Sequence, residues 1–366
     1  YKKDKGSLAK HLKTEPSASQ YPVLAVAESG DHPIHVLRRG NPALPGPLVS
    51  PAFPSIFGES KLVIPANYKT GNSSGRRRAL AEWVASPDNP MTARVMVNRI
   101  WQYHFGRGIV RSSNDFGLQG DDPTHPDLLN WLAYQFVESG WDIKAMHRLI
   151  MSSQAYQRSS IPQDGALLKD PLNDLFWRFD MRRLQAEEVR DSILAVRGSL
   201  NLEMGGISVT PPLPKIILQT ASQPDKAWGN STPRQANRRS VYVKVKRSLQ
   251  DPILLSHDMA DTDTTCPVRF TTTVPTQALT MMNGEFVNES ALNFAERIRQ
   301  NAGPSPREQV EKGLSLVFSR MPKPEEVKAG VRMMEEVAKA GGLSPKEALD
   351  RFALLALNLN EFIYLD

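Results

Sequence analysis

The sequence predicts a mainly α protein, namely a multi-helix globular domain with a small β contribution and long irregular loops. Apolar side chains recur at helical spacing through most of residues 76–200 and 275–366. Two strong helix starts, at Ser305 and Ser344, combine a capping box with proline at the first helical position. The 366 residues are 40% hydrophobic and 23% charged, which is ordinary for globular proteins and excludes a disordered or collagen-like chain.

Residues 1–75 are predicted to form an irregular, proline-rich N-terminal segment with short strands. Prolines occupy positions 42, 45, 47, 51 and 54. Each fixes φ and removes a backbone donor, so neither a helix nor a central strand runs through them. Short strands are expected at 21–27 and 35–38. The composition of 71–75 (GNSSG) indicates a flexible hinge, and a domain boundary is expected there.

Helical patterns follow at 77–86, 90–105, 124–139 and 143–153. Apolar side chains surround the second of these helices almost completely, which is typical of a buried helix. Three polar residues nevertheless share one side of it: Arg94, Asn98 and Gln102. Because a buried charge needs a partner, Arg94 or Arg99 is expected to contact a carboxylate or carbonyl group, first of all that of Asp115.

The remaining chain is predicted to alternate between helices and a long insert. A helix is expected at 185–200, and 204–237 are irregular. The alternation in 240–246 (SVYVKVK) predicts a strand. Helices resume at 275, and 352–357 form a buried helical face. The helical domain therefore covers 76–366: the groups 76–200 and 275–366 share one core, and 201–274 form a loop and strand insert.

Composition and motifs exclude several classes of function. With Cys266 as the single cysteine, the chain forms no internal disulfide, thiolate zinc site or covalent haem attachment, and no cofactor is expected within it. The sequence Asp115-Phe-Gly117 matches a kinase motif whose other parts are absent. A net charge of +6 is too mild to indicate nucleic-acid binding. No apolar run is long enough to predict a transmembrane segment.

The first candidate site lies around the loop that follows the helix at 90–105. In one interpretation Asp115 and His125 serve as base and acid, while Arg99 and Asn98 hold an anionic group. In the other interpretation the same residues form a structural clamp that fixes the glycine-rich loop 114–125. His125→Gln would separate the two, because glutamine does not titrate near neutral pH.

The second candidate site is a basic segment at 234–247, which contains no acidic residue. On the predicted strand, Tyr242, Lys244 and Lys246 share one face, with Arg239 close by in sequence. Such a face is suited to phosphate, sulfate or uronate groups, or to an acidic patch on a partner. The alternative is a solvated face of a sheet.

The third candidate is a group of metal-ligating residue types at 256–266: His257, Asp258, Asp261 and Asp263. Carboxylate oxygens suit a hard cation such as Ca²⁺. The spacing lacks the glycine and the terminal glutamate of an EF-hand, so a polar capped loop is the alternative.

The sequence also resembles a known family. Residues 80–160 closely resemble a planctomycete-type domain of unknown function, found C-terminally in large exported, cytochrome c-associated proteins. Further similar segments are 238–243, 272–279 with Asn283, and 357–362. The resemblance implies an exported protein, periplasmic or at the cell surface, although the lysine-rich start at Tyr1 is not an intact signal peptide and suggests a fragment or a processed product. Relatives commonly follow a haem module and occur beside sulfatase-like proteins in bacteria that degrade polysaccharides.

The resemblance implies two functions of different classes. The first is an accessory or assembly domain that engages an anionic polysaccharide or a haem-bearing partner within a larger exported assembly. The alternative is an enzyme of complex-polysaccharide breakdown, hydrolytic or haem-linked and oxidative. Haem c would then belong to another segment or to a partner, because this chain lacks the attachment motif. The family supplies no catalytic residues to transfer.

Overall fold

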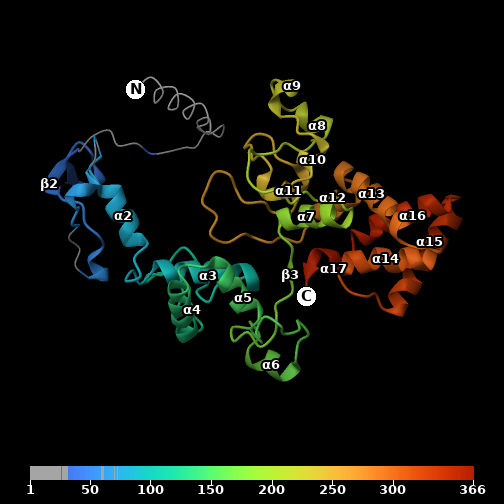
Figure 1. Ribbon diagram of the computed structural model, residues 1–366, viewed down its shortest axis with the longest axis horizontal. Helices are drawn as coiled ribbons and strands as arrows, with labels where there is room; N and C mark the ends of the chain where they lie inside the picture. Colours follow the sequence, from blue (N-terminus) through green and yellow to red (C-terminus); the bar gives the residue numbers. More distant parts are fainter. Residues whose placement is uncertain (1–25, 27–31, 59–61, 70, 72) are drawn as a thin grey trace, which may run out of the picture. The chain divides into compact units, whose positions relative to one another are not determined.

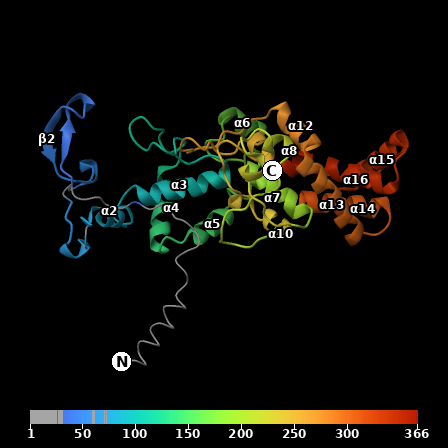
Figure 2. The same ribbon diagram turned by 90° about the horizontal axis from the view of Figure 1, so that it is seen from above.

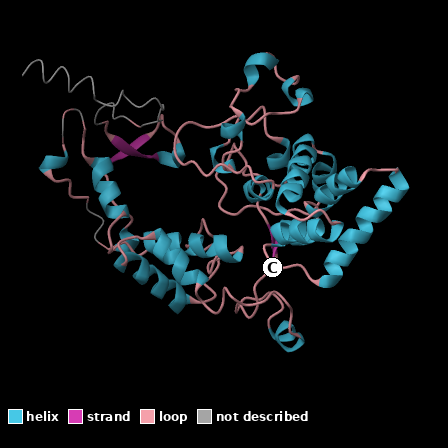
Figure 3. Cartoon of the chain, turned by 45° about the vertical axis from the view of Figure 1, so that its right-hand side comes forward, coloured by secondary structure: helices cyan, strands magenta, loops and turns pink. Residues whose placement is uncertain are grey.

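The computed structural model describes residue 26 and the ranges 32–58, 62–69, 71 and 73–366. The chain divides into two compact units, Tyr1–Ser152 and Ser153–Asp366. Helices predominate among the described residues, and the β-structure consists of two two-stranded sheets and isolated bridges (Figure 3). The predicted mainly α class is confirmed. None of the described helices combines the length and the apolarity that crossing a bilayer requires.

The first unit begins with a β-hairpin. Strands β1 (Ile34–Leu37) and β2 (Pro45–Val49) pair antiparallel, and the 3-10 turn η1 (Arg38–Gly40) follows β1 directly. The strand expected at 35–38 is therefore confirmed. The strand expected at 21–27 lies outside the described residues, except for Val26. Two more 3-10 turns, η2 (Ser55–Phe57) and η3 (Ala66–Tyr68), lead to helix α2 (Arg76–Val84).

Three helices form the core of the first unit, close to their predicted positions: α3 (Thr92–Phe105), α4 (Pro126–Glu138) and α5 (Ile143–Met151). Helix α3 packs against both α4 and α5, and it ends where Gly106 adopts a φ of 80°. The buried apolar residues of the three helices include Val97, Trp101, Phe105, Leu129, Leu132, Phe136, Met146 and Ile150.

The second unit contains the remaining elements (Figure 1). Its helices are α6 (Asp164–Lys169), α7 (Ala186–Val196), α8 (Lys215–Leu218), α9 (Pro224–Ala227), α10 (Pro233–Ala236), α11 (Pro252–Ser256), α12 (Pro275–Asn283), α13 (Glu285–Asn301), α14 (Pro306–Phe318), α15 (Pro324–Gly341), α16 (Pro345–Ala356) and α17 (Asn360–Ile363). Strands β3 (Arg182–Arg183) and β4 (Tyr364–Leu365) pair antiparallel.

The core of the second unit is built by helices α13 to α16, which are grouped together in Figure 2. Helix α7 adds Val189 and Ile193 to this core and also packs on α11. The two predicted capping boxes are confirmed, because the hydroxyls of Ser305 and Ser344 accept from the backbone N–H groups three residues later. The domain boundary expected at residue 75 stays a prediction. The expectation that residues 76–151 pack in one core with the C-terminal helices also stays a prediction.

The strand predicted at 240–246 is wrong. The chain instead forms the 3-10 turn η4 (Ser240–Tyr242), followed by a single bridge between Val243 and Val209. The backbone N–H and the hydroxyl of Ser240 both donate to the Asp191 carboxylate, each at 2.7 Å. Because a side chain of α7 takes this donor, the backbone turns here instead of continuing as an extended strand.

A charged cluster joins the ends of the C-terminal helices and predicts an acid-sensitive contribution to stability. Arg320 donates to Glu326 at 2.8 Å and to Glu361 at 2.6 Å. The hydrogen bond from Arg320 lowers the pKa of Glu326 to about 2. A carboxylate with a lowered folded-state pKa stabilises the fold above its unfolded pKa, and this stabilisation is lost as the pH falls towards about 2.

Glu326→Gln is therefore expected to reduce the free energy of unfolding at pH 6 by up to about 1 kcal/mol, since the pair is partly exposed. The difference from wild type should shrink as the pH falls from about 4.5 towards about 2. Urea unfolding at several pH values measures it. Glu336→Gln, which removes an exposed partner of Arg332 at 3.7 Å, is the control. A difference for Glu326→Gln that stays constant with pH would contradict the expectation.

Candidate functional site

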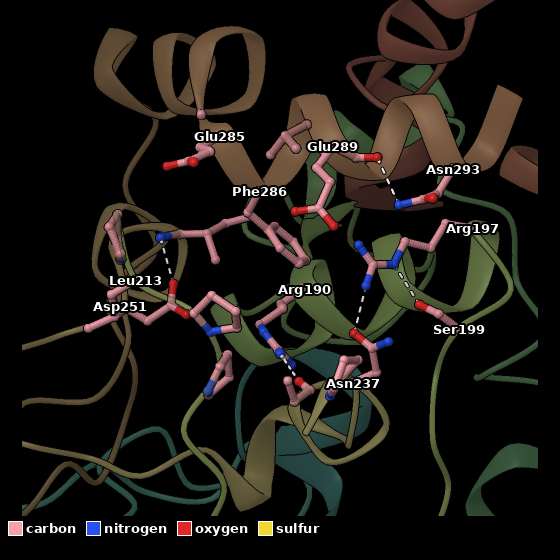
Figure 4. Close-up of a pocket in the computed structure, with 18 of the residues that line it drawn as sticks. Arg190, Arg197, Ser199, Leu213, Asn237, Asp251, Glu285, Phe286, Glu289 and Asn293 are labelled. Atoms are coloured by element: carbon pink, nitrogen blue, oxygen red, sulfur yellow. Dashed lines mark hydrogen bonds between the residues drawn. The ribbon is translucent and has the colours of Figure 1, made fainter. Parts of the chain in front are cut away.

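A cavity of about 680 Å³ lies in the second unit, within the size range of small-molecule sites. Its walls come from α7, the beginning of α13, the start of α11 and the segment 211–237, which contains the short helices α8 to α10 (Figure 4). These segments are far apart in the sequence, and the fold of the second unit brings them together. Two arginines provide its most distinctive chemistry: Arg190 in α7 and Arg197, which caps the end of α7.

Arg190 is a charged side chain in a nearly dry environment, with 1% of its surface exposed. Its Nη2 donates to the Ala236 carbonyl at 2.7 Å, and its Nη1 donates to Ser240 Oγ at 3.1 Å and to the Arg238 carbonyl at 3.2 Å. The carboxylate of Asp191 is 3.9 Å away. Burial lowers the pKa of Arg190, although an arginine remains charged at neutral pH.

Arg197 lies two helical turns after Arg190 and therefore faces the same side of α7. Its guanidinium donates to the side-chain oxygens of Asn237 at 2.6 Å, Ser290 at 3.0 Å and Ser199 at 2.5 Å. All three acceptors are neutral, and burial lowers the pKa of Arg197. The two arginines thus bring two positive charges to the cavity that are held mainly by uncharged acceptors.

The ring of Phe286 lies close to both guanidinium groups (Figure 4). Its centroid is 5.6 Å from the Cζ atom of Arg190 and 5.6 Å from that of Arg197. A cation at this distance is attracted to the face of the ring. The ring therefore helps to hold both charges at the cavity and adds an apolar surface. Five prolines extend that apolar surface: Pro211, Pro212, Pro214, Pro233 and Pro252.

Carboxylates also line the cavity, in two different environments. Asp251 caps α11 by accepting from the Ile253 N–H at 3.0 Å, and burial raises the pKa of its carboxyl. Glu285 and Glu289 project from the beginning of α13 and are exposed. The charge of Glu289 favours the protonated form of Arg197. The lining thus combines the two arginines with one buried carboxyl, that of Asp251, and with exposed carboxylates near solvent.

The lining can bind a polar ligand with an apolar face and an anionic substituent. Guanidinium groups bind carboxylate and sulfate groups through paired hydrogen bonds. Amides such as Asn237 and Asn293 both donate to and accept from hydroxyls. The residues that line the cavity include no histidine, cysteine or lysine, so the nucleophile–base pairs that involve those side chains are not formed here.

The four residues of the first predicted site lie near one loop of the first unit. Asn98 is buried, and its side chain both donates to the Val110 carbonyl at 3.0 Å and accepts from the Val110 N–H at 2.8 Å. Arg99 donates to Asn114 Oδ1 at 2.8 Å. Asn98 and Arg99 thus hold the chain that follows α3, and the clamp interpretation stays a prediction.

Asp115 and His125 each bond within their own loop. Asp115 accepts from the Gly117 N–H at 2.9 Å, and His125 Nδ1 lies 3.0 Å from Thr124 Oγ1. Asp115 was expected first as the partner of Arg94 or Arg99, but Arg94 donates to Asn130 Oδ1 at 2.8 Å and to a backbone carbonyl. The acid–base role of Asp115 and His125 stays a prediction.

The structure does not bring the predicted basic segment together as one face. Tyr242 accepts from the Gly205 N–H at 2.9 Å and lies under the guanidinium of Arg238 at 3.8 Å. Lys246 donates to the Ala227 carbonyl at 2.7 Å. Arg239 lies 3.7 Å from Asp191, and Lys244 is exposed. These residues therefore have different neighbours.

Each of the four predicted metal ligands likewise interacts with a different set of protein groups. Asp258 binds Arg183 at 2.6 Å and Thr272 at 2.9 Å. His257 is buried, with its Nδ1 3.0 Å from the Ile253 carbonyl. Asp261 accepts from the N–H of Asp263 at 2.9 Å, and Asp263 pairs with Arg247. Across the part of the chain that the structure describes, no group of three or more His, Cys, Asp or Glu side chains is placed to hold a metal ion.

The cavity was not predicted from the sequence, although one signal for it is present. Arg190, Ile193 and Arg197 follow one another at i, i+3 and i+7, so two charges lie in the apolar stripe of a helix. Long charged side chains on such a stripe indicate either a buried pair or a binding site. The contributions of Asp251 and Phe286 have no comparable local signal.

Comparison with known proteins supplies one match. The model of a family described as "Protein of unknown function (DUF1553)", PSD1, matches residues 76–334. The matched range includes both the cavity residues of α7 and α13 and the helices of the first unit from α2 onward. No curated protein and no solved structure shows significant similarity to the chain.

Proposed function

This chain belongs to the PSD1 (DUF1553) family of proteins of unknown function, and we propose that it is an accessory glycan-binding domain of an exported assembly. Its cavity in the second unit holds an acidic sugar unit of a polysaccharide. One observation carries the proposal: Arg190 and Arg197 line a cavity of about 680 Å³, hydrogen-bond to neutral acceptors and lie close to the ring of Phe286.

Arg197 provides the contact to the acidic group. A guanidinium has five N–H donors, and Arg197 uses three of them on Asn237, Ser290 and Ser199 among the described residues. The N–H groups that remain on its two Nη atoms suit the oxygens of a carboxylate or sulfate. A charge-assisted bond in a partly buried site is stronger than one in water.

The other lining residues suit the sugar ring. The apolar C–H face of a pyranose packs on an aromatic ring, and Phe286 offers one. The hydroxyls can bond to Asn237, Asn293 and the exposed carboxylates of Glu285 and Glu289. The combination of one apolar face with several planar polar groups distinguishes a sugar from a free inorganic anion as the preferred ligand.

The wider setting belongs to the same proposal. The resemblance of residues 80–160 to domains of exported, cytochrome c-associated proteins supports a location outside the cytoplasm. It also supports an assembly with a haem-bearing partner. In that assembly this domain would hold the polysaccharide while the partner carries out chemistry.

Arg197→Gln is expected to weaken the binding of a uronic oligosaccharide by about 30-fold or more, because it removes the charged partner of the carboxylate. Binding of the neutral oligosaccharide with the same linkage should change much less. Isothermal titration calorimetry with both ligands measures this, and the melting temperature reports whether the variant is folded. The control is Arg234→Gln, since Arg234 is exposed and does not line the cavity. Equal affinity of wild type for the neutral and the uronic ligand would contradict the proposal.

A second candidate function, an enzyme of polysaccharide breakdown, rests on Asp251. Burial raises the pKa of this carboxyl, as is typical of a general acid, and further carboxylates line the same cavity. Incubation of the same oligosaccharides with wild type and with Asp251→Asn separates the two functions. Products that form with wild type and not with Asp251→Asn support the enzyme, whereas tight binding without products supports the accessory domain.

A further inference from the structure

Two histidines of the first unit meet although they are far apart in the sequence. Nε2 of His104, in the last turn of α3, lies 2.8 Å from Nδ1 of His147 on α5. Their ring centroids are 5.0 Å apart, and the rings are inclined by 70°. Both side chains are half-buried, so the pair is shielded by the helices but still accessible from solvent.

We propose that His104 and His147 bind a Cu²⁺ ion between α3 and α5. The spacing of the two nitrogens carries the argument. A metal–imidazole bond measures about 2.0–2.1 Å, so two imidazoles at adjacent corners of a square-planar or tetragonal ion place their nitrogens about 2.8–3.0 Å apart. A tetrahedral ion requires about 3.3–3.4 Å. In the metal-free pair a hydrogen bond holds the two nitrogens 2.8 Å apart, close to the spacing of adjacent ligands on a square ion, so the rings must turn until both lone pairs point at the ion.

The helices hold the two histidines in place before a metal binds. On α3, Trp101 and Phe105 are buried on either side of His104 in the sequence, and their rings stack at 4.2 Å. On α5, Met146 and Ile150 are buried next to His147. Since α3 packs directly on α5, the two ring nitrogens are already close together before a metal binds.

The donor set favours copper over other divalent ions. Imidazole nitrogen suits the late first-row transition metals, and affinity along this series is highest for Cu²⁺. In the described residues no third His, Cys, Asp or Glu joins the pair, so water completes the coordination. A structural zinc site normally uses four protein ligands, which this pair does not supply. An ion with open water positions is also free to exchange or to bind a small ligand.

The test titrates the full-length chain with CuCl2, following the copper d–d absorption and calorimetric heat. Wild type is expected to bind one ion more tightly than His104→Gln and His147→Gln, by about tenfold or more for each variant. The matched control is the double variant His32→Gln, His35→Gln, which removes two histidines three residues apart in one segment and should leave the tight site unchanged. Equal copper affinity of wild type and of both single variants would overturn the proposal.

Paramagnetic resonance of copper-loaded wild type provides a second readout that does not depend on the folding of variants. The expected spectrum shows a tetragonal Cu²⁺ ion coupled to two imidazole nitrogens. Coupling to one imidazole or to none at one equivalent of copper would overturn the proposal. Competition with ZnCl2 tests the preference for copper: Zn²⁺ should displace copper only in large excess, and displacement by equimolar Zn²⁺ would also overturn the proposal.

Discussion

Replacing Phe352 by alanine is expected to lower the free energy of unfolding of the second unit by about 3–5 kcal/mol. The ring is 1% exposed in the core formed by α13 to α16. Helices α14 and α15 approach it closely at two glycines. A Cβ on Gly313 would lie 2.8 Å from Phe352 Cε1, and a Cβ on Gly330 would lie 3.1 Å from its Cε2. Because neither glycine has a side chain to move into the space left by the ring, the cavity collapses poorly and the cost is high.

Urea unfolding followed by circular dichroism measures this effect. Leu355→Ala is the control, since Leu355 lies on the same helix and is 40% exposed, so it should cost about 1 kcal/mol or less. Gly330→Ala should also destabilise, although alanine favours helices, because its Cβ would lie 2.6 Å from Val310 Cγ1. Equal losses for Phe352→Ala and Leu355→Ala would show that the ring does not organise this core.

The helices were predictable from the sequence because their signals are local. At the start of α14, Ser305 and Glu308 satisfy each other's backbone donors, with Glu308 N–H to Ser305 Oγ at 3.3 Å and Ser305 N–H to Glu308 Oε2 at 3.2 Å. Both partners lie within four residues. Such a signal is visible without knowledge of the rest of the fold.

The segment 240–246 was not predictable in this way, because its conformation depends on a distant residue. Its alternation of valine with polar residues suggests two faces of a strand. In the structure Val243 is buried, whereas Val241 and Val245 are largely exposed, so the alternation does not describe two faces. The turn at Ser240 is fixed by Asp191, which lies 49 residues earlier in the chain. A pairing of this kind appears only when the tertiary structure is known.

Contacts between residues that are distant in the sequence also explain why the cavity is lined by other residues than those of the predicted sites. The predicted sites were chosen from residues close together in the sequence, such as Asp115 and His125 or the basic residues of 234–247. The cavity is assembled from α7, α11, α13 and the segment 211–237. Its most informative residue, Arg190, stands in the apolar stripe of a helix that the sequence analysis predicted correctly. The charge on that stripe was the overlooked signal.

Arg190→Met is expected to lower the free energy of unfolding by about 3 kcal/mol or more at neutral pH. The change removes the cost of burying a charge, which is a gain. However, it leaves the buried carbonyls of Ala236 and Arg238 without the donor that Arg190 supplies, and the Ser240 hydroxyl keeps only its bond to Asp191. Each unsatisfied buried group costs about 1–3 kcal/mol, so the loss outweighs the gain. Arg190→Lys should cost less, since it keeps the charge but one ammonium cannot reach all three acceptors.

The pH dependence of Arg190→Met separates the loss of the charge interaction with Asp251 from the loss of hydrogen bonds and packing. Burial raises the pKa of Asp251 in the folded protein, and the charge of Arg190 opposes this rise. Without Arg190 the folded-state pKa of Asp251 rises further. A carboxyl whose pKa is raised by folding is protonated below its unfolded-state pKa and does not destabilise the fold there. Stability is lost as the pH rises from the unfolded-state pKa through the folded-state pKa. The loss of unfolding free energy caused by Arg190→Met should therefore be larger at pH 7 than at pH 4. The usual aspartate pKa of about 4 makes pH 4 the start of this change.

Adding Asp251→Asn to Arg190→Met should remove the difference between the two pH values, because asparagine carries no charge. Urea unfolding of the single and double variants at both pH values measures it. A deficit that is the same at pH 4 and pH 7 would show that Arg190 acts through its hydrogen bonds and packing, and not through the charge of Asp251.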